Sequence, residues 1–394
     1  MAFFADIQQK PADPIFALTK EFIDDGRHGK VNLGIGIYCD EEQNLYEFPS
    51  IATAEQRIAY ERTYLPLDGN KDFITLSQKL VFGEKTVALA EGRISSAQAL
   101  GGTGALRVGG EFLAQHVGKK AFIPDKTWIN HRAVFTRCGM DVQTYPYWDA
   151  ESRDLDFSGL CSSITAMEEG SIVILHACCH NPTGTDPSKE EWKELSALMK
   201  KHKIIPFFDF AYQGFGEGIE EDAWAVRHFV EEGHEMLVAS SNSKNFGLYG
   251  ERVGMLSVVC HNKTIAENVG TNIKKIIRPS YSNPPRHGAA LVAEVLGDDT
   301  LKTQWEKELS EIRHRIKAMR EALIKGLEDK KADIDIDFMK NQKGMFSFGF
   351  LNEKSAGPLK EKHGIYFPDN GRINVAGLTE NNMEYVVEAI LEAL

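Results

Sequence analysis

Two continuous apolar runs constrain the fold of this chain more than any other feature of its sequence. Ser171–Leu175 and Ile204–Phe208 are rich in β-branched and aromatic residues, as expected of strands that are buried on both faces. Between them, Glu190–His202 has the spacing of a helix. Short apolar runs and amphipathic segments alternate in the same way from about residue 95 onward, which is typical of parallel strands joined by helices. The sequence therefore predicts an α/β fold with a mostly parallel central sheet.

The pattern changes near Leu301, where apolar residues begin to recur at steps of three and four positions and continue to Leu323. This spacing predicts one long amphipathic helix. A chain of 394 residues is long enough for two domains of about 100–200 residues each, and the long helix would connect them. Beyond the long helix we expect a strand, a helix, a strand and a helix, at Gly344–Phe350, Ser355–His363, Arg372–Ala376 and Glu380–Leu394.

The composition excludes several classes of protein. A formal net charge of −12 argues against binding to nucleic acid or to a membrane surface, since both need basic patches. The N-terminus has no secretory signal, and no stretch approaches the roughly 20 apolar residues of a membrane span. The six cysteines form no Cys-x-x-Cys pair, and we expect buried thiols rather than metal ligands at Cys178 and Cys179. A reduced, cytoplasmic protein without a metal is the simplest interpretation.

One polar run carries a candidate reactive group. Ser241–Arg252 lies between the apolar runs Met236–Ala239 and Val253–Val259, and it places Lys244 at the end of a predicted strand. A lysine that forms a Schiff base needs a partly dry pocket, because desolvation lowers the pKa of its amine. Serines and an arginine close by are what a phosphate group needs to be held next to that amine. The alternative interpretation of the run is an ordinary surface loop.

Three other segments have a chemical and a structural interpretation each. Gly101–Arg107 joins a strand to the predicted helix Ala105–His116, where glycines and free N–H groups suit an anion, although such a turn is often only structural. His180–Thr185 contains the turn formers Asn-Pro and Thr-Gly, so a plain loop is the default. Asp209 ends an apolar strand, where a carboxylate is costly unless it is paired; a helix cap or a structural ion pair would also explain it.

These segments, in this order, resemble the class I (fold type I) pyridoxal-phosphate aminotransferases, and most closely the aspartate and aromatic aminotransferase subgroup. The resemblance extends from Asp13 to the last predicted helix. It implies pyridoxal 5'-phosphate as the cofactor, held on Lys244 through a Schiff base. One position departs from the family pattern, because Asn242 stands where an aromatic or apolar residue is usual.

The resemblance also implies the roles of single residues. Asp209 would keep the ring nitrogen of the cofactor protonated, Tyr212 would donate to its phenolic oxygen, and Lys244 would move the proton; these three are the expected catalytic residues. His131 would lie behind the ring. The expected cofactor-binding residues are Gly102, Thr103, Trp128, Asn181, Asp209, Tyr212, Ser241, Lys244, Arg252 and Tyr64, and the expected substrate-binding residues are Gly36, Trp128, Asn181, Arg278 and Arg372.

Two of these residues imply a homodimer with shared active sites. In the family, the residues that correspond to Tyr64 and Arg278 reach into the neighbouring subunit, where the tyrosine meets the phosphate and the arginine meets the distal carboxylate of the substrate. We accordingly expect a large cofactor-binding domain at 46–310. The small domain would comprise 1–45 and 311–394, with an N-terminal arm that contacts the partner subunit.

The substrates follow from the two arginines. Arg278 and Arg372 imply a dicarboxylate, so that amino transfer between amino acids and 2-oxo acids would use 2-oxoglutarate and glutamate. Aspartate is the expected donor, with tyrosine and phenylalanine as further donors: Cys39, Leu45 and Thr63 replace more polar residues of the aspartate enzymes, whereas Asn283 and Thr103 keep their pattern. A pyridoxal-phosphate lyase or decarboxylase on the same fold is the alternative.

Overall fold

The computed structural model describes residues 2–60, 62–331 and 334–393. Its centre is a seven-stranded sheet in which only β10 runs antiparallel to its neighbours, while the other neighbouring pairs are parallel. The mostly parallel sheet that the apolar runs predicted is therefore present. In spatial order the strands are β2 (Ile94–Leu100), β10 (Val253–Val259), β9 (Met236–Ser241), β8 (Ile205–Phe210), β7 (Ile172–His176), β3 (Lys120–Pro124) and β4 (Asp141–Tyr145).

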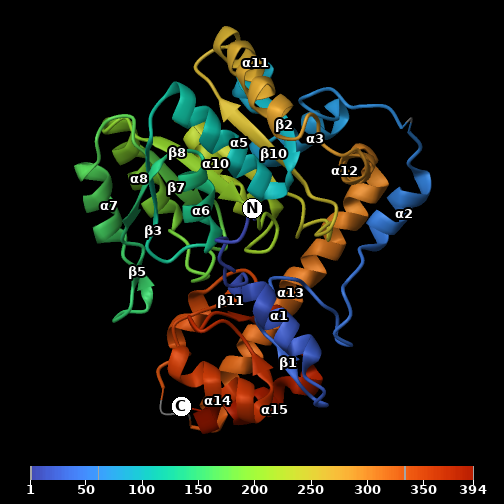
Figure 1. The fold of residues 1–394 in the computed structure, drawn as a ribbon, viewed down its shortest axis with the longest axis vertical. Coiled ribbons are helices and arrows are strands. Elements are labelled where there is room, and N and C mark those ends of the chain that lie inside the picture. Colours follow the sequence, from blue (N-terminus) through green and yellow to red (C-terminus); the bar gives the residue numbers. More distant parts are fainter. Residues whose placement is uncertain (1, 61, 332–333, 394) are drawn as a thin grey trace.

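Helices cover both faces of this sheet (Figure 1). The two faces have separate hydrophobic cores, and neighbouring residues of β8 alternate between them: Phe207 belongs to one core and Phe208 to the other. The core around Phe207 includes residues of α5 (Gly101–His116), α6 (Asn130–Arg137) and α11 (Lys263–Ser280). The core around Phe208 includes residues of α3 (Lys71–Phe82), α7 (Phe157–Ala166), α8 (Lys189–Lys201), α10 (Trp224–Glu231) and α12 (His287–Gly297).

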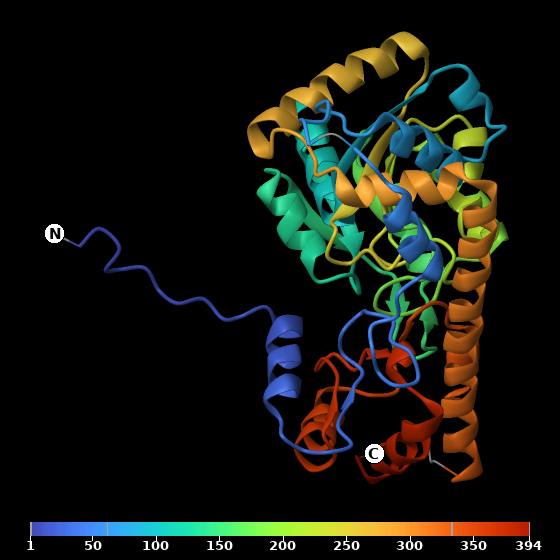
Figure 2. The same cartoon turned by 90° about the vertical axis from the view of Figure 1, so that its right-hand side faces the viewer.

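The long helix α13 (Asp299–Asp329) is the main connection between the sheet and the C-terminal part of the chain (Figure 2). It contains 31 residues, and every apolar residue of the predicted stripe is buried on it. Near its N-terminus, Glu308 accepts hydrogen bonds from the backbone N–H and the hydroxyl of Ser50, in α2 (Pro49–Arg57). The prediction of one long amphipathic helix is confirmed.

The two ends of the chain lie together beyond the sheet. β1 (Val31–Asn32), which follows α1 (Pro14–Asp24), pairs in parallel with β12 (Ile365–Tyr366). The residues before α1 extend away from the body of the molecule (Figure 2), and Phe3 and Phe4 on this arm are exposed. The remaining elements are α4 (Val87–Ala90), β5 (Trp148–Asp149), β6 (Asp154–Leu155), α9 (Ile219–Asp222), η1 (Asp337–Asn341), β11 (Phe346–Ser347), α14 (Glu353–His363), β13 (Ile373–Asn374), η2 (Val375–Gly377) and α15 (Glu380–Ala393).

Two expected strands are much shorter than predicted. Only Phe346–Ser347 of the expected strand Gly344–Phe350 pairs, and its partner is Ile373–Asn374. Glycines explain the limits of this strand, because Gly344 and Gly349 have positive φ angles of 73° and 103°, which an extended strand does not allow. The expected strand Arg372–Ala376 is cut short because η2 begins at Val375. Among the described residues, no helix is long and apolar enough to cross a membrane.

Candidate active site

The topology brings the chemical motifs to one edge of the sheet. Parallel strands end at the same edge, so the segments that follow β3, β7, β8 and β9 meet there. The segments after β3, β7 and β9 carry Trp128, Asn181 and Lys244, and Asp209 lies within β8 near its end. α5 begins at the same edge after β2, and Arg252 precedes the antiparallel strand β10 there. Residues from five separate motifs thus line one cavity of about 230 Å³.

One end of this cavity has the donors that a phosphate group needs. The predicted helix Ala105–His116 in fact begins at Gly101, so Gly102 and Thr103 lie in its first turn, where backbone N–H groups have no partner within the helix. Ser241 and Arg252 line the same cavity. We call these four residues the anion cradle. A side chain at Gly101 would not fit, because its Cβ would lie 2.5 Å from Nη2 of Arg252.

Lys244 lies in the middle of the cavity, with its Nζ 4.6 Å from the ring centre of Tyr212. Burial lowers the pKa of this amine to about 8, although the carboxylate of Asp209 acts in the opposite direction. The backbone of the lysine loop is fixed from behind by α13, where the indole N–H of Trp305 donates to the carbonyl of Asn245 at 2.6 Å. Trp305 also stacks on Phe246, with ring centres 4.4 Å apart.

Asp209 is paired with a histidine beneath the cavity. Nε2 of His131 lies 3.0 Å from Oδ2 of Asp209, and Nδ1 of the same ring lies 2.8 Å from the hydroxyl of Thr127. Burial alone would raise the pKa of Asp209, but the hydrogen bond and charge of His131 hold it below its usual value. The carboxylate therefore stays ionised at the end of an apolar strand, which is the property that the sequence argument required.

A second cavity of about 650 Å³ opens beside the first, and Trp128, Asn181, Tyr212 and Lys244 line both. Arg372 lies on its wall. Its Nη1 donates to Oδ1 of Asn181 at 3.2 Å and its Nη2 to the carbonyl of Gly34 at 2.6 Å.

Among the described residues, Nε of Arg372 is buried without a partner, and the guanidinium has no carboxylate within ion-pair distance. Burial lowers the pKa of Arg372 to about 10, so the side chain keeps its charge at neutral pH. An unpaired buried guanidinium is costly. A carboxylate ligand would satisfy it through paired hydrogen bonds.

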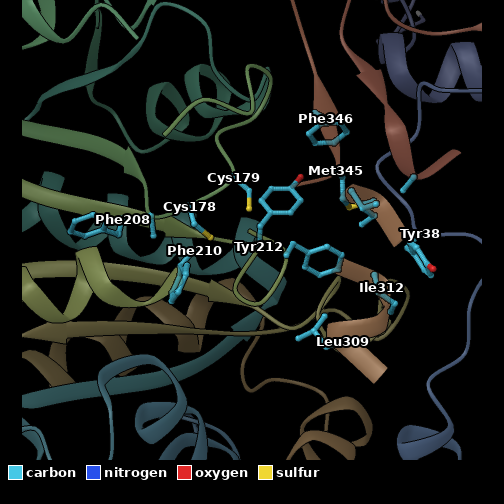
Figure 3. Close-up of a cluster of buried hydrophobic side chains, with 14 of the residues drawn as sticks. Tyr38, Cys178, Cys179, Phe208, Phe210, Tyr212, Leu309, Ile312, Met345 and Phe346 are labelled. Carbon is cyan, nitrogen blue, oxygen red and sulfur yellow. The ribbon is translucent and has the colours of Figure 1, made fainter. Parts of the chain in front are cut away.

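Phe346 belongs to the site, although no motif in the sequence indicates it. The guanidinium carbon of Arg372 lies 4.1 Å from the centre of this ring, and the ring also faces Gly36. The same ring packs against Tyr212 (Figure 3). In the sequence it is one of 22 phenylalanines, in a segment that reads as an ordinary strand. Ser243 and Tyr249 also line the first cavity, and their places in the Lys244 run could have suggested it.

Two expected site residues lie elsewhere in this single chain. Tyr64 is 88% exposed and Arg278 is exposed with Nη1 donating to Ser282, and neither lines the two cavities. Four of the residues on which the choice of amino-acid donor was argued also lie outside both cavities. They are Cys39, Leu45, Thr63 and Asn283. Gly36 and Arg372, by contrast, line the second cavity as expected.

The segment after β7 contains two adjacent buried cysteines. Cys178 and Cys179 are free and buried, and their sulfur atoms lie within 4.8 Å of a carboxylate oxygen of Asp222. That carboxylate accepts backbone hydrogen bonds from Gly214 and Gly216. Burial raises the pKa of Cys179 to about 11. Asp222 thus has a structural role, and both thiols stay protonated at neutral pH.

The fold and the site together define an α/β enzyme in which one cavity contains a lysine amine and an anion cradle, and an adjoining cavity contains a buried arginine. Residues 28–390 match the family described as aminotransferase class I and II. The chain belongs to this family, which confirms the resemblance and the fold class that the sequence predicted.

Individual relatives agree over the full length. The aspartate aminotransferase of Haemophilus influenzae is 44% identical over 395 residues, covering 99% of this chain and 100% of the relative. The aromatic-amino-acid aminotransferase of Burkholderia pseudomallei, solved covalently bound to pyridoxal phosphate, is 42% identical with a TM-score of 0.97 over 100% of both chains. A psychrophilic aromatic amino acid aminotransferase of Psychrobacter sp. B6, cocrystallised with aspartic acid, is 39% identical with a TM-score of 0.96 over 99% of both chains.

Proposed function

We propose that this enzyme is a pyridoxal-phosphate aminotransferase that transfers the amino group of aspartate, tyrosine or phenylalanine to 2-oxoglutarate. One observation carries the proposal. Lys244, whose amine has a lowered pKa, lines one cavity with the anion cradle and Asp209, and it also lines the cavity that contains Arg372. The relatives named for aspartate and for aromatic substrates support this choice of donors.

The residues of the first cavity fit the cofactor. Gly102, Thr103, Ser241 and Arg252 would hold its phosphate, and Trp128 would stack on its ring. Asn181 and Tyr212 would bind its phenolic oxygen, and Asp209 its ring nitrogen. When bound, pyridoxal phosphate supplies an electron-withdrawing ring that stabilises negative charge on the α-carbon of the substrate.

Three residues of the chain would bind the substrate, keep the ring nitrogen protonated and move the proton. Arg372 binds the α-carboxylate of the substrate, because its buried Nε has no hydrogen-bond acceptor among the described residues and a carboxylate oxygen would supply one. Asp209 remains ionised through His131 and so favours a protonated ring nitrogen. Lys244 removes the proton from the α-carbon and returns it, because an amine with a pKa near 8 is matched to work at neutral pH.

Binding of the distal carboxylate of the substrate would need a second subunit. Tyr64 and Arg278, which lie outside the cavities here, would complete the site of a partner subunit in a homodimer. The large domain would be 46–310, and the small domain 1–45 with 311–394; the pairing of β1 with β12 supports the association of the two ends. The six free cysteines support a cytoplasmic location.

The test is steady-state transamination by the purified, cofactor-loaded protein. 2-Oxoglutarate is the acceptor, and aspartate, tyrosine and phenylalanine are compared as donors. Similar kcat/KM values for aspartate and the aromatic donors would support dual specificity, and a large gap in favour of either would remove it. Bound cofactor without amino transfer from any donor would contradict the proposal and favour a lyase or a decarboxylase.

A further inference from the structure

The ring beneath Arg372 is held by a very short segment. Phe346 and Ser347 form β11, which pairs with β13 through only two residues on each strand. One further backbone bond joins the segments, from the N–H of Val375 to the carbonyl of Met345 at 2.8 Å. Sheets of two strands are marginally stable by themselves, so the position of Phe346 depends on what contacts the other side of the segment.

That other side is held by Arg320 of α13. Nη2 of Arg320 donates to the carbonyl of Phe346 at 3.2 Å and to that of Gly344, and Nε donates to the hydroxyl of Ser347 at 3.1 Å. One guanidinium thus bonds three residues of a four-residue segment. A lysine could not reproduce this arrangement, because its ammonium is a point charge without a planar set of donors.

Burying the charge of Arg320 costs more folding free energy than a purely structural hydrogen bond would justify. It is 5% exposed, and no described carboxylate lies within ion-pair distance of it. Burial lowers its pKa to about 10, so it stays charged at neutral pH. A buried charge without a counter-ion is normally disfavoured, and here its donors are directed at the backbone of the residue that supports Arg372.

We propose that Arg320 is a positioning residue for substrate carboxylate binding, which it controls by holding Phe346 against the guanidinium of Arg372. The inference rests on the proposed function, in which Arg372 binds the carboxylate. The chain of contacts is direct: α13 to segment 344–347, Phe346 to Arg372, and Arg372 to the second cavity. A ring displaced from beneath Arg372 leaves the guanidinium free to tilt, so its donors no longer converge on one carboxylate.

The experiment measures binding of succinate, a non-reacting dicarboxylate, to the holoenzyme by calorimetry, together with KM and kcat. The variants are Arg320→Lys, Arg320→Met and Phe346→Leu. Each should weaken succinate binding and raise KM by about tenfold to a hundredfold, the cost of displacing a binding group by about an ångström. For the two Arg320 variants, the kcat at saturation should stay within about threefold, because Arg320 lines neither of the two cavities. Leu327→Ala is the matched control, since Leu327 is fully buried on the same helix.

Leu327→Ala should lower the melting temperature while changing succinate affinity by less than about twofold. The proposal is overturned if the Arg320 variants melt earlier but bind succinate like the parent, or if Leu327→Ala weakens binding as much as they do. If Arg320→Met does not fold, Arg320→Lys decides. If the parent enzyme binds succinate but transfers no amino group, the proposed function is wrong. The role of Arg320 in carboxylate binding is then judged from the succinate affinities of the variants alone. A parent that does not bind succinate would overturn both.

Discussion

The amine of Lys244 is under the influence of several neighbours at once. Burial lowers its pKa, the carboxylate of Asp209 raises it, and the guanidinium groups of Arg252 and Arg372 lower it again. The result is a pKa of about 8, well below that of an exposed lysine. At the scale of one residue, the chemistry therefore depends on a small set of charges whose removal can be tested singly.

Lys244→Ala should abolish transamination, with kcat reduced by about 10³-fold or more, because no other described amine lies in the cavity to move the proton. The anion cradle is untouched, so the variant should still bind the cofactor non-covalently. Kinetics and the visible spectrum after gel filtration measure the two effects. Turnover near the parent rate would refute the role given to Lys244.

The pH dependence of cofactor capture reports the pKa of the same amine. Only the neutral amine attacks a carbonyl, so the rate at which cofactor-free protein attaches pyridoxal phosphate should rise with pH around a midpoint near 8 and level off above it. Asp209→Asn removes the charge that raises this pKa, so its midpoint should lie lower. Stopped-flow absorbance measures the rate, and a midpoint near that of a free lysine would show that the amine is not desolvated.

At the scale of elements, the first turn of α5 decides whether an anion can bind. Glycine-rich sequence made Gly101–Gly104 look like a loop, but the helix already begins at Gly101. Propensity favours loops where glycines cluster, whereas here the positive φ of 66° at Gly101 and the close approach of Arg252 require glycine at the start of the helix. The N–H groups of the first turn are left free as a consequence.

Gly101→Ala should therefore weaken cofactor binding. The new Cβ would meet the Arg252 guanidinium at 2.5 Å, and alanine at positive φ adds about 1–2 kcal/mol of strain. We expect cofactor affinity to fall by about tenfold or more, measured by fluorescence titration of the cofactor-free protein. Gly118→Ala, just beyond the other end of α5, has only a carbonyl at 3.7 Å from the new Cβ and should bind the cofactor normally. Equal affinities for both variants would contradict this account of the cradle.

The elements also show which predictions a sequence supports. The strands of the sheet and α13 were predictable, because burial on two faces and a long apolar stripe leave clear periodic patterns. β11 and β13 were overestimated, since apolar residues such as Phe348 and Phe350 are buried without belonging to a strand. Hydrophobicity indicates burial but not strand pairing, which stops at the positive-φ glycines beside β11 and at η2 after β13.

At the scale of the whole molecule, the residues that lie outside the cavities become informative. The N-terminal arm projects from the molecule (Figure 2), and Tyr64 and Arg278 are exposed in a single chain. Exposed aromatic residues such as Phe3 on the arm favour contact with another surface. The homodimer of the proposed function would give each of them a partner.

A mixing experiment tests the shared site. Lys244→Ala and Arg278→Ala chains should each be nearly inactive with aspartate. Random mixing gives about half hybrid dimers with one intact site of two, so activity should recover to about a quarter of the parent value. Mixing Arg278→Ala with the double variant Lys244→Ala/Arg278→Ala should recover nothing. Failure of the first mixture to regain activity, with exchange of subunits verified, would place Arg278 outside the neighbouring site.

Much of the site could be read from short phrases of sequence, because Trp128, Asn181, Asp209 and Lys244 each end or follow a strand at one edge of the sheet. Phe346 and Arg320 could not, since their roles arise from contacts with residues far along the chain. A single sequence indicates the secondary structure that each segment favours, but it does not indicate which residues far apart in the chain will be in contact.

Because α13 is long, a small tilt at one of its ends moves the other end much further. Trp305 attaches one end to the carbonyl of Asn245, and the helix then runs for about 36 Å to Asp329. A tilt of about 5° at the Trp305 end would move the far end by about 3 Å while hardly displacing the lysine loop. Arg320 lies along this arm, so small rotations would be amplified at the carboxylate site and damped at the amine.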